Sequence, residues 1–223
     1  MKKIMQKQKR PQMPVIGLIG PTNLQRISQA SGIPEHRYRD AAYGAGRVVA
    51  RMNAILTIVP DRGVAVSGMC GYREAQGAWT VGLVPAGGPS DAVATPNCLE
   101  NSAACDEVIG GFTWHHQHAF ICEFSNLLIC IGLSCGTIAE IAWTKWVKGP
   151  KVLVMRDTLT SIPKEITAET DIDFVDTVEE LEMKVAEALP LKKSSASFSS
   201  EASRSERDAG NLRRYSPIWS PSR

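Results

Sequence analysis

Short apolar runs recur along the chain and alternate with longer stretches in which small and apolar residues return every three or four positions. Six runs are rich in Val, Ile and Leu or lie between turn residues, which is typical of buried strands: residues 15–21, 55–59, 79–85, 127–133, 152–155 and 171–175. This pattern predicts a set of strands separated by helices.

The stretches between the runs carry helical periodicity. Residues 39–53 predict a helix that lies on the sheet, and residues 64–76 predict one that packs closely through Gly68 and Gly71. A further helix follows residues 134–137 and ends at Gly149-Pro150, and the capping-box pattern at 177–180 begins the last one. Strands that alternate with helices favour an α/β fold, a single doubly wound Rossmann-like domain with a mainly parallel sheet.

One long segment departs from this alternation. Residues 86–113 are rich in Gly, Pro, Ser and Asn, which indicates either a functional loop or a disordered insertion. The 223 residues suffice for one domain with a sizeable core. We therefore expect a disordered basic leader at 1–13, the Rossmann-like domain at 14–191 and a disordered tail rich in Ser and Arg at 192–223.

The charge of the chain is nearly balanced, with a formal net charge of +2. No strong global field holds it on nucleic acid or on an anionic membrane, so a small charged ligand is the expected partner. The apolar run Leu127–Ile131 is too short to cross a bilayer, and no secretory signal is recognised. The expected location is the cytoplasm, with an organelle left open, and the six cysteines are expected to be reduced and mostly buried.

The residues that point to chemistry follow the apolar run 127–133. The small-residue turn Ser134-Cys135-Gly136-Thr137 leads directly into a helix that carries Glu140. Backbone N–H groups at such a turn can approach a phosphate, and the helix dipole favours its negative charge. Thr137 could add its hydroxyl as a donor, and the Glu140 carboxylate could act as a base or stabilise a developing cation. A turn that serves packing alone is the alternative interpretation.

This segment also resembles a known family. Residues 136–140 match the second half of Pro-Gly-Gly-x-Gly-Thr-x-x-Glu, the hallmark of the Rossmann-like group that contains the Lonely Guy phosphoribohydrolases, formerly labelled lysine decarboxylases, and the molybdenum-cofactor carrier proteins. Other segments of the chain are similar to those of the family and occur in the same order: residues 16–20, 63–64, 71–85 and 138–152. The last of these segments is similar to the carrier-like branch in particular. The resemblance spans roughly residues 14–190 and implies the same fold, a phosphorylated ligand and a homo-oligomer.

The departures from the family pattern concern the ligand site. The phosphoribohydrolases have an arginine on the helix before the hallmark strand, where this chain has Gln117 or His118. Neither supplies a permanently charged guanidinium fork for a phosphate. Two hallmark glycines are replaced by Leu133 and Ser134, whose side chains hinder a close approach to the backbone. These changes favour binding over hydrolysis.

A metal site is the alternative use of the histidines in this region. His115, His116 and His118 lie close together, and Cys122 follows His118 at a helical interval of four. Imidazole and thiolate are good ligands for zinc or copper, but no paired spacing such as Cys-x-x-Cys accompanies them. We therefore expect no metal, and we assign Trp114 and the other tryptophans at 143 and 146 to packing or to a dimer surface.

Ligands of open α/β sheets bind at the carboxyl ends of the strands. The expected site therefore combines the strand ends near Gly20-Pro21, Gly63 and Pro85–Gly88 with residues 134–137, and it adds Gln117, His118 and, as a tentative catalytic group, Glu140. We expect the chain to bind a nucleotide or a molybdopterin-type ligand without a required cofactor. The alternatives are a phosphoribohydrolase that releases the free base from a nucleoside 5′-monophosphate, and a domain that serves association alone.

Overall fold

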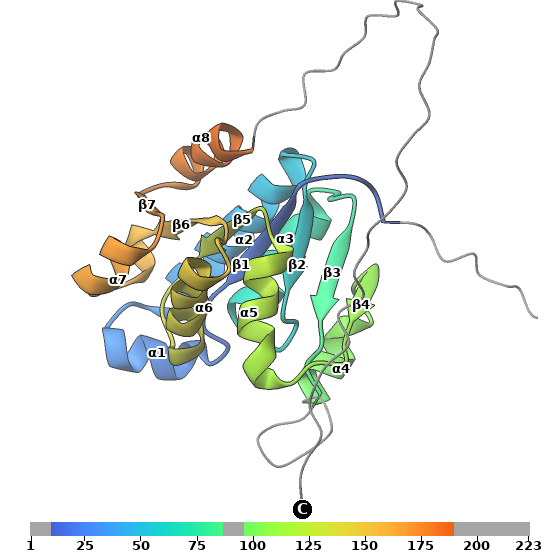
Figure 1. Ribbon diagram of the computed structural model, residues 1–223, viewed down its shortest axis with the longest axis horizontal. Helices are drawn as coiled ribbons and strands as arrows, with labels where there is room; N and C mark the ends of the chain where they lie inside the picture. Colours follow the sequence, from blue (N-terminus) through green and yellow to red (C-terminus); the bar gives the residue numbers. More distant parts are fainter. Residues whose placement is uncertain (1–9, 87–95, 190–223) are drawn as a thin grey trace, which may run out of the picture. The chain divides into compact units, whose positions relative to one another are not determined.

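The computed structural model describes residues 10–86 and 96–189 of the chain. These residues form a seven-stranded sheet in the order β4-β3-β2-β1-β5-β6-β7, and each neighbouring pair of strands is parallel (Figure 1). The strands are β1 Val15–Ile19, β2 Ile55–Ile58, β3 Thr80–Leu83, β4 Glu107–Ile109, β5 Leu127–Cys130, β6 Lys151–Met155 and β7 Ile172–Val175. The expected parallel α/β fold is confirmed.

Helices connect the strands and cover both faces of the sheet. They are α1 Leu24–Ser31, α2 Glu35–Arg51, α3 Val64–Glu74, α4 Pro96–Ser102, α5 Trp114–Phe124, α6 Cys135–Trp146, the 3₁₀ turn η1 Arg156–Thr158, α7 Lys164–Glu169 and α8 Val178–Ala188. Residues of α1, α2, α3 and α8 pack on one face, and those of α5, α6 and α7 pack on the other. In Figure 1, α5 and α6 lie in front of the sheet.

The alternation of side chains along each strand produces these two layers. On β5, Leu127 and Ile129 belong to the hydrophobic cluster under α2 and α3, whereas Leu128 and Cys130 belong to the cluster under α5 and α6. All four side chains are fully buried. A strand that is buried on both faces reads as a continuous apolar run because neither set of alternate positions contacts water.

Glycines allow α2 and α3 to pack unusually closely. A Cβ atom at Gly46 would lie 1.9 Å from the carbonyl oxygen of Gly68, and one at Gly71 would lie 2.1 Å from that of Tyr43. The contact predicted through Gly68 and Gly71 is therefore present, and Gly46 supplies its other side. A side chain at Gly46 or Gly71 would separate the two helices, whereas one at Gly68 would meet the side chain of Leu18 on β1, 2.0 Å from its Cβ position.

The structure corrects several expectations about the elements. The glycine-rich excursion at 86–113 contains α4 and the edge strand β4, and the short helices α1 and α7 were not predicted. Arg10, assigned to a disordered leader, pairs with Glu107 at 2.6 Å and lies over the ring of Phe124. Residues 1–9 of the expected leader, the tail at 192–223 and Gly87-Gly88 lie outside the described residues.

Strand β1 is where the order of the sheet reverses. The chain runs from β1 to β2 on one side and returns to β5 on the other side of β1. Gly20 follows β1 directly, and a Cβ atom there would lie 2.4 Å from the carbonyl oxygen of Ile131. Loops leaving β1 and β5 diverge beyond this contact, which leaves a crevice at the carboxyl edge of the sheet.

Candidate functional site

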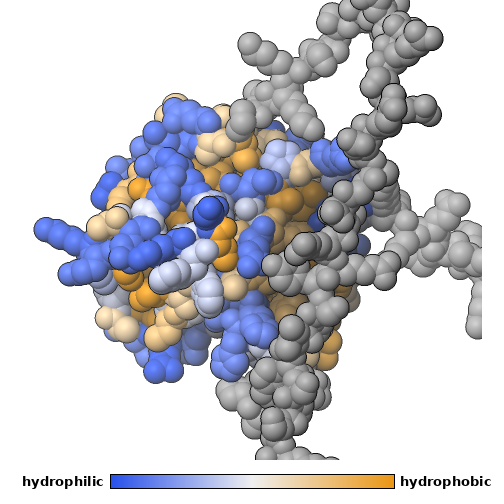
Figure 2. Space-filling model, in the orientation of Figure 1, coloured by the Kyte–Doolittle hydropathy of each residue, from blue (hydrophilic) through white to orange (hydrophobic). Residues whose placement is uncertain are grey.

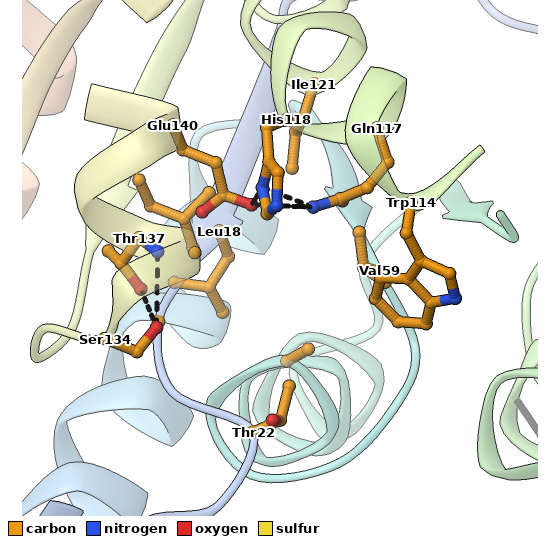
Figure 3. Close-up of a pocket in the computed structure, with 14 residues that line it drawn as sticks. Leu18, Thr22, Val59, Trp114, Gln117, His118, Ile121, Ser134, Thr137 and Glu140 are labelled. Carbon is orange, nitrogen blue, oxygen red and sulfur yellow. Dashed lines mark hydrogen bonds and ion pairs between the residues drawn. The ribbon is translucent and has the colours of Figure 1, made fainter. Parts of the chain in front are cut away.

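A cavity of about 260 Å³ lies in this crevice, beside the first turn of α6 (Figure 3). Its wall combines the end of β1, the start of α3 and the facing sides of α5 and α6. The residues that line it are Leu18, Ile19, Gly20, Thr22, Val59, Ala65, Trp114, Gln117, His118, Ile121, Ser134, Gly136, Thr137 and Glu140. Segments from more than half of the chain therefore meet at one point.

The first turn of α6 presents hydrogen-bond donors beside the cavity. Ser134 is the N-cap: its Oγ accepts from the amide of Thr137 at 3.2 Å and lies 2.9 Å from the Thr137 hydroxyl. Among the described residues, the amides of Cys135 and Gly136 have no hydrogen-bond partner. The helix end therefore keeps two uncommitted amides, while the amide of Thr137 is already satisfied by the cap.

Glu140 lies one turn into α6 and is largely buried. Its Oε1 lies 3.1 Å from Nδ1 of His118 and accepts a hydrogen bond from Nε2 of Gln117 at 3.3 Å. Nε2 of Gln117 also lies 2.5 Å from Nδ1 of His118. Sequence counting left open whether Gln117 or His118 takes the place of the family's arginine, and the fold brings both to the Glu140 carboxylate.

A backbone turn closes the side of the cavity opposite α5. The amide of Val64 donates to the carbonyl oxygen of Pro21 at 3.1 Å, which ties the start of α3 to the loop after β1. Gly63 has a φ of 65° and lies so close to this loop that a Cβ atom would be 2.3 Å from the Pro21 oxygen. Only glycine accepts both this conformation and this contact.

The structure brings most of the expected site residues to the cavity, while Pro21, Gly63, Cys135 and the expected strand end at Pro85-Ala86 do not line it. Gly20, Gln117, His118 and Glu140 line it, together with three residues of the expected turn: Ser134, Gly136 and Thr137. Pro21 and Gly63 support the wall without lining it, and the side chain of Cys135 is exposed to solvent.

Sequence reasoning missed other lining residues. Trp114 and Ile121 lie one helical turn before and after His118, and Thr22 follows the Gly20-Pro21 turn, so helical spacing and chain proximity would have found them. Trp114, assigned to packing or a dimer surface, lines the cavity instead. Trp143 and Trp146 are 40% and 71% exposed, on a stretch of α6 with a shallow apolar hollow. Figure 2 shows apolar patches between hydrophilic residues on the face that carries α5 and α6.

The histidines and cysteines near the site are not arranged as metal ligands. Within residues 10–86 and 96–189, no group of three or more His, Cys, Asp or Glu side chains is placed to hold a metal ion. His115 and His116 are exposed, and the thiol of Cys122 donates to the carbonyl oxygens of His118 and Glu140, each at 3.1 Å.

Burial separates the six free cysteines into two classes. Burial raises the pKa of Cys122 to about 12, with a further contribution from Glu140, and raises the pKa of Cys105 to about 11. Burial also raises the pKa of Cys130, and Cys98 is buried, whereas Cys70 and Cys135 are exposed. A raised pKa keeps a thiol protonated and unreactive at neutral pH.

We therefore expect a thiol reagent such as Ellman's reagent to modify Cys70 and Cys135 quickly in the native protein and the other cysteines only after denaturation. The Cys70→Ser and Cys135→Ser variants should each have one fewer thiol that reacts quickly with the reagent. Rapid modification of Cys122 in the folded chain would contradict the packing of α5 against α6.

Comparison with known proteins identifies a family. The family model described as the SLOG cluster4 family matches residues 13–182, which is well over half of the chain. Among curated proteins, no match to the sequence is found.

Solved structures share the fold at low sequence identity. The molybdenum cofactor carrier protein from Chlamydomonas reinhardtii has a TM-score of 0.58 at 23% identity, covering 79% of this chain and 98% of that one. The molybdenum cofactor binding protein from Rippkaea orientalis has a TM-score of 0.60 at 18% identity, covering 79% and 97%.

DNA processing protein A from Helicobacter pylori, described by its single-stranded DNA binding mode, also matches, with a TM-score of 0.56 at 10% identity and coverage of 78% and 80%. The same fold therefore serves different ligands, and the fold alone does not determine what this chain binds. In the described part of the chain, no helix is both long enough and apolar enough to span a membrane.

Proposed function

Because this chain belongs to the SLOG cluster4 family, we propose that it binds a nucleotide or a nucleotide-like phosphorylated cofactor in the cavity beside α6. The first turn of α6 carries the proposal, since the amides of Cys135 and Gly136 have no partner among the described residues. Unpaired amides and the helix dipole together favour an anion, and a phosphate is the common anion at helix N-termini.

The size of the cavity limits the ligand. Small-molecule sites usually enclose about 300–1,000 Å³, and this cavity of about 260 Å³ lies just below that range. A mononucleotide or a single pterin-type group suits this space better than a dinucleotide. The phosphate would contact Gly136 and the hydroxyls of Ser134 and Thr137, and the rest of the ligand would extend toward Trp114 and Val59 on the opposite wall (Figure 3).

The likeness to molybdenum cofactor carrier and binding proteins makes a molybdopterin-type ligand one candidate. In this proposal the ligand is cargo, and the protein needs no other cofactor. We also keep the expectations that the protein works in the cytoplasm, pairs with a second copy and does not act on nucleic acid.

Hydrolysis of an N-glycosidic bond is the second candidate, because a carboxylate lines the cavity one turn beyond the phosphate position. Glu140 could stabilise the oxocarbenium-like transition state of a nucleoside 5′-monophosphate. Against turnover, the carboxylate oxygen Oε1 already contacts His118 and Gln117, and none of the lining residues is an arginine. Binding is therefore the preferred function.

Two measurements test the proposal. Mass spectrometry of small molecules released from the purified native protein should find a phosphorylated heterocycle, and calorimetry with guanosine and adenosine 5′-monophosphates should detect binding. Incubation with the same nucleotides should release no free base. Base release that disappears in Glu140→Gln would establish the hydrolase instead, and a folded protein that binds no nucleotide and carries no ligand would favour a domain that serves association alone.

A further inference from the structure

The charges that line the cavity conflict with anion binding. Of the residues that line it, only His118 and Glu140 are ionisable, and none is a lysine or arginine. The Glu140 side chain is 9% exposed, so its charge is poorly screened by water. A phosphate at the first turn of α6 would therefore meet a buried carboxylate and no permanent cation.

His118 occupies the position where a positive charge would help most. The edge of its ring faces the first turn of α6, since Cε1 and Nε2 lie 3.1 Å and 3.9 Å from the Cβ position at Gly136. Figure 3 shows the imidazole between Glu140 and Gln117 on the wall of the cavity. Its side chain is 24% exposed, so solvent can exchange protons with the ring.

The neighbours of His118 suit both of its protonation states. When Nδ1 is unprotonated, it can accept a hydrogen bond from Nε2 of Gln117 at 2.5 Å; when it is protonated, it can donate to Oε1 of Glu140 at 3.1 Å. In the imidazolium, Nδ1 holds Glu140 while the N–H at Nε2 is left for a ligand. On protonation, Nδ1 exchanges the amide of Gln117 for the carboxylate of Glu140 as its partner, and Gln117 can accept from the imidazolium only if its side-chain amide turns the unpartnered Oε1 toward the ring.

Other groups around His118 do not supply that charge. Cys122 on α5 contacts the carbonyl oxygen of His118, and the raised pKa of its thiol, about 12, keeps it neutral. The lining residues of β1, Leu18 and Ile19, are apolar, and α6 contributes only Glu140 as an ionisable lining residue. His115 and His116 are exposed to solvent, outside the cavity wall.

Resting on the anion-binding function proposed above, we propose that His118 takes up one proton from solvent when an anion binds, so that the ligand is held by an imidazolium in place of an arginine. The imidazole gains the proton, the ligand keeps its charge, and no covalent bond forms. The complex then holds one more proton than the separate partners, so affinity falls as pH rises. The ligand class is an anion such as a phosphate monoester.

Sulfate is the probe that tests this coupling, because its charge stays constant between about pH 6 and about pH 8.5, where a phosphate ester would itself titrate. Calorimetry on the full-length protein should give a sulfate affinity that falls by about tenfold for each pH unit over which close to one proton is taken up. Titrations in two buffers of different ionisation enthalpy should show uptake of close to one proton per sulfate. Binding that is equally tight at all pH values, without proton uptake, overturns the proposal.

Variants at position 118 separate the coupling from the binding function. His118→Arg should bind sulfate with little dependence on pH, His118→Gln should bind weakly at every pH, and the exposed control His116→Arg should behave as the wild type. A pH dependence that persists unchanged in His118→Arg assigns the proton to another group and refutes the role of His118. Absence of sulfate and nucleotide binding by the wild type at every pH would instead refute the anion-binding function itself.

Discussion

Replacement of Gly46 by alanine is expected to lower the melting temperature by about 5–10 °C, which corresponds to roughly 2–4 kcal/mol. The added methyl would lie 1.9 Å from the carbonyl oxygen of Gly68 and 2.8 Å from the amide nitrogen of Tyr72, and both are backbone atoms of α3. Backbone atoms inside a helix cannot move aside singly, so α2 and α3 must separate. Circular dichroism during thermal unfolding measures the effect.

Gly44→Ala is the matched control on the same helix. A methyl at Gly44 would approach the side chain of Val178 at 2.8 Å, and a side chain can change its rotamer. Alanine also favours the helix over glycine by roughly 0.5–1 kcal/mol, so this variant should be close to neutral or slightly stabilising. Equal losses in the two variants would show that glycine is not needed specifically at the contact between α2 and α3.

Replacement of Gly136 by valine is expected to weaken binding of a nucleoside monophosphate by about a hundredfold, because hydrogen bonds to charged groups contribute about 1.5–3 kcal/mol. The Cβ position at Gly136 already lies 3.1 Å from Cε1 of His118. A branched side chain there would fill the space between the imidazole and the first turn of α6, where the phosphate is proposed to bind. Calorimetry compares the affinities.

Cys135→Val provides the control for this substitution. It places the same side chain one residue earlier in α6, at a position that is exposed and does not line the cavity. Its affinity for the nucleotide should match that of the wild type, and both variants should keep the native melting temperature within a few degrees. If both valine substitutions reduce the affinity equally, nucleotide binding does not specifically require the open space beside Gly136, and the proposed position of the phosphate is wrong.

The strands and longer helices could be predicted from the sequence because their signals are local. Apolar runs marked β1, β2, β3, β5 and β6, and Thr177 caps α8 by accepting from the amide of Glu180 at 3.1 Å, as its spacing predicted. The spacing between Gly136 and Glu140 in the sequence likewise places the carboxylate about one helical turn beyond the start of the helix. This follows from helix geometry and does not depend on the packing around the helix. Helical geometry alone therefore places Glu140 close to the start of α6.

Elements with weak local signals were missed or misread. Strand β4 has three residues within a glycine-rich segment, and it exists because its backbone pairs with β3. Helix α1 is polar and short, although Asn23 caps its start and Gly32, with a φ of 75°, ends it. Both cap residues can be recognised in the sequence, but the same residue types also occur in many turns that begin or end no helix. Without an apolar stripe between them, they do not identify a helix.

Contacts between distant segments lie beyond any local pattern. Gln117 and His118 precede Glu140 by 23 and 22 residues, and they meet its carboxylate only because α5 and α6 pack side by side over β5 and its neighbours. The same packing turns Trp114 toward the cavity, while Cys135 points to solvent despite its place in the motif. The periodicity of the sequence thus specified which residues share a face of one helix. Which helix faces pack against each other depended on the order of the strands in the sheet. The reason is that hydrogen bonds and close packing act between residues that are close in space, even where they are far apart in the sequence.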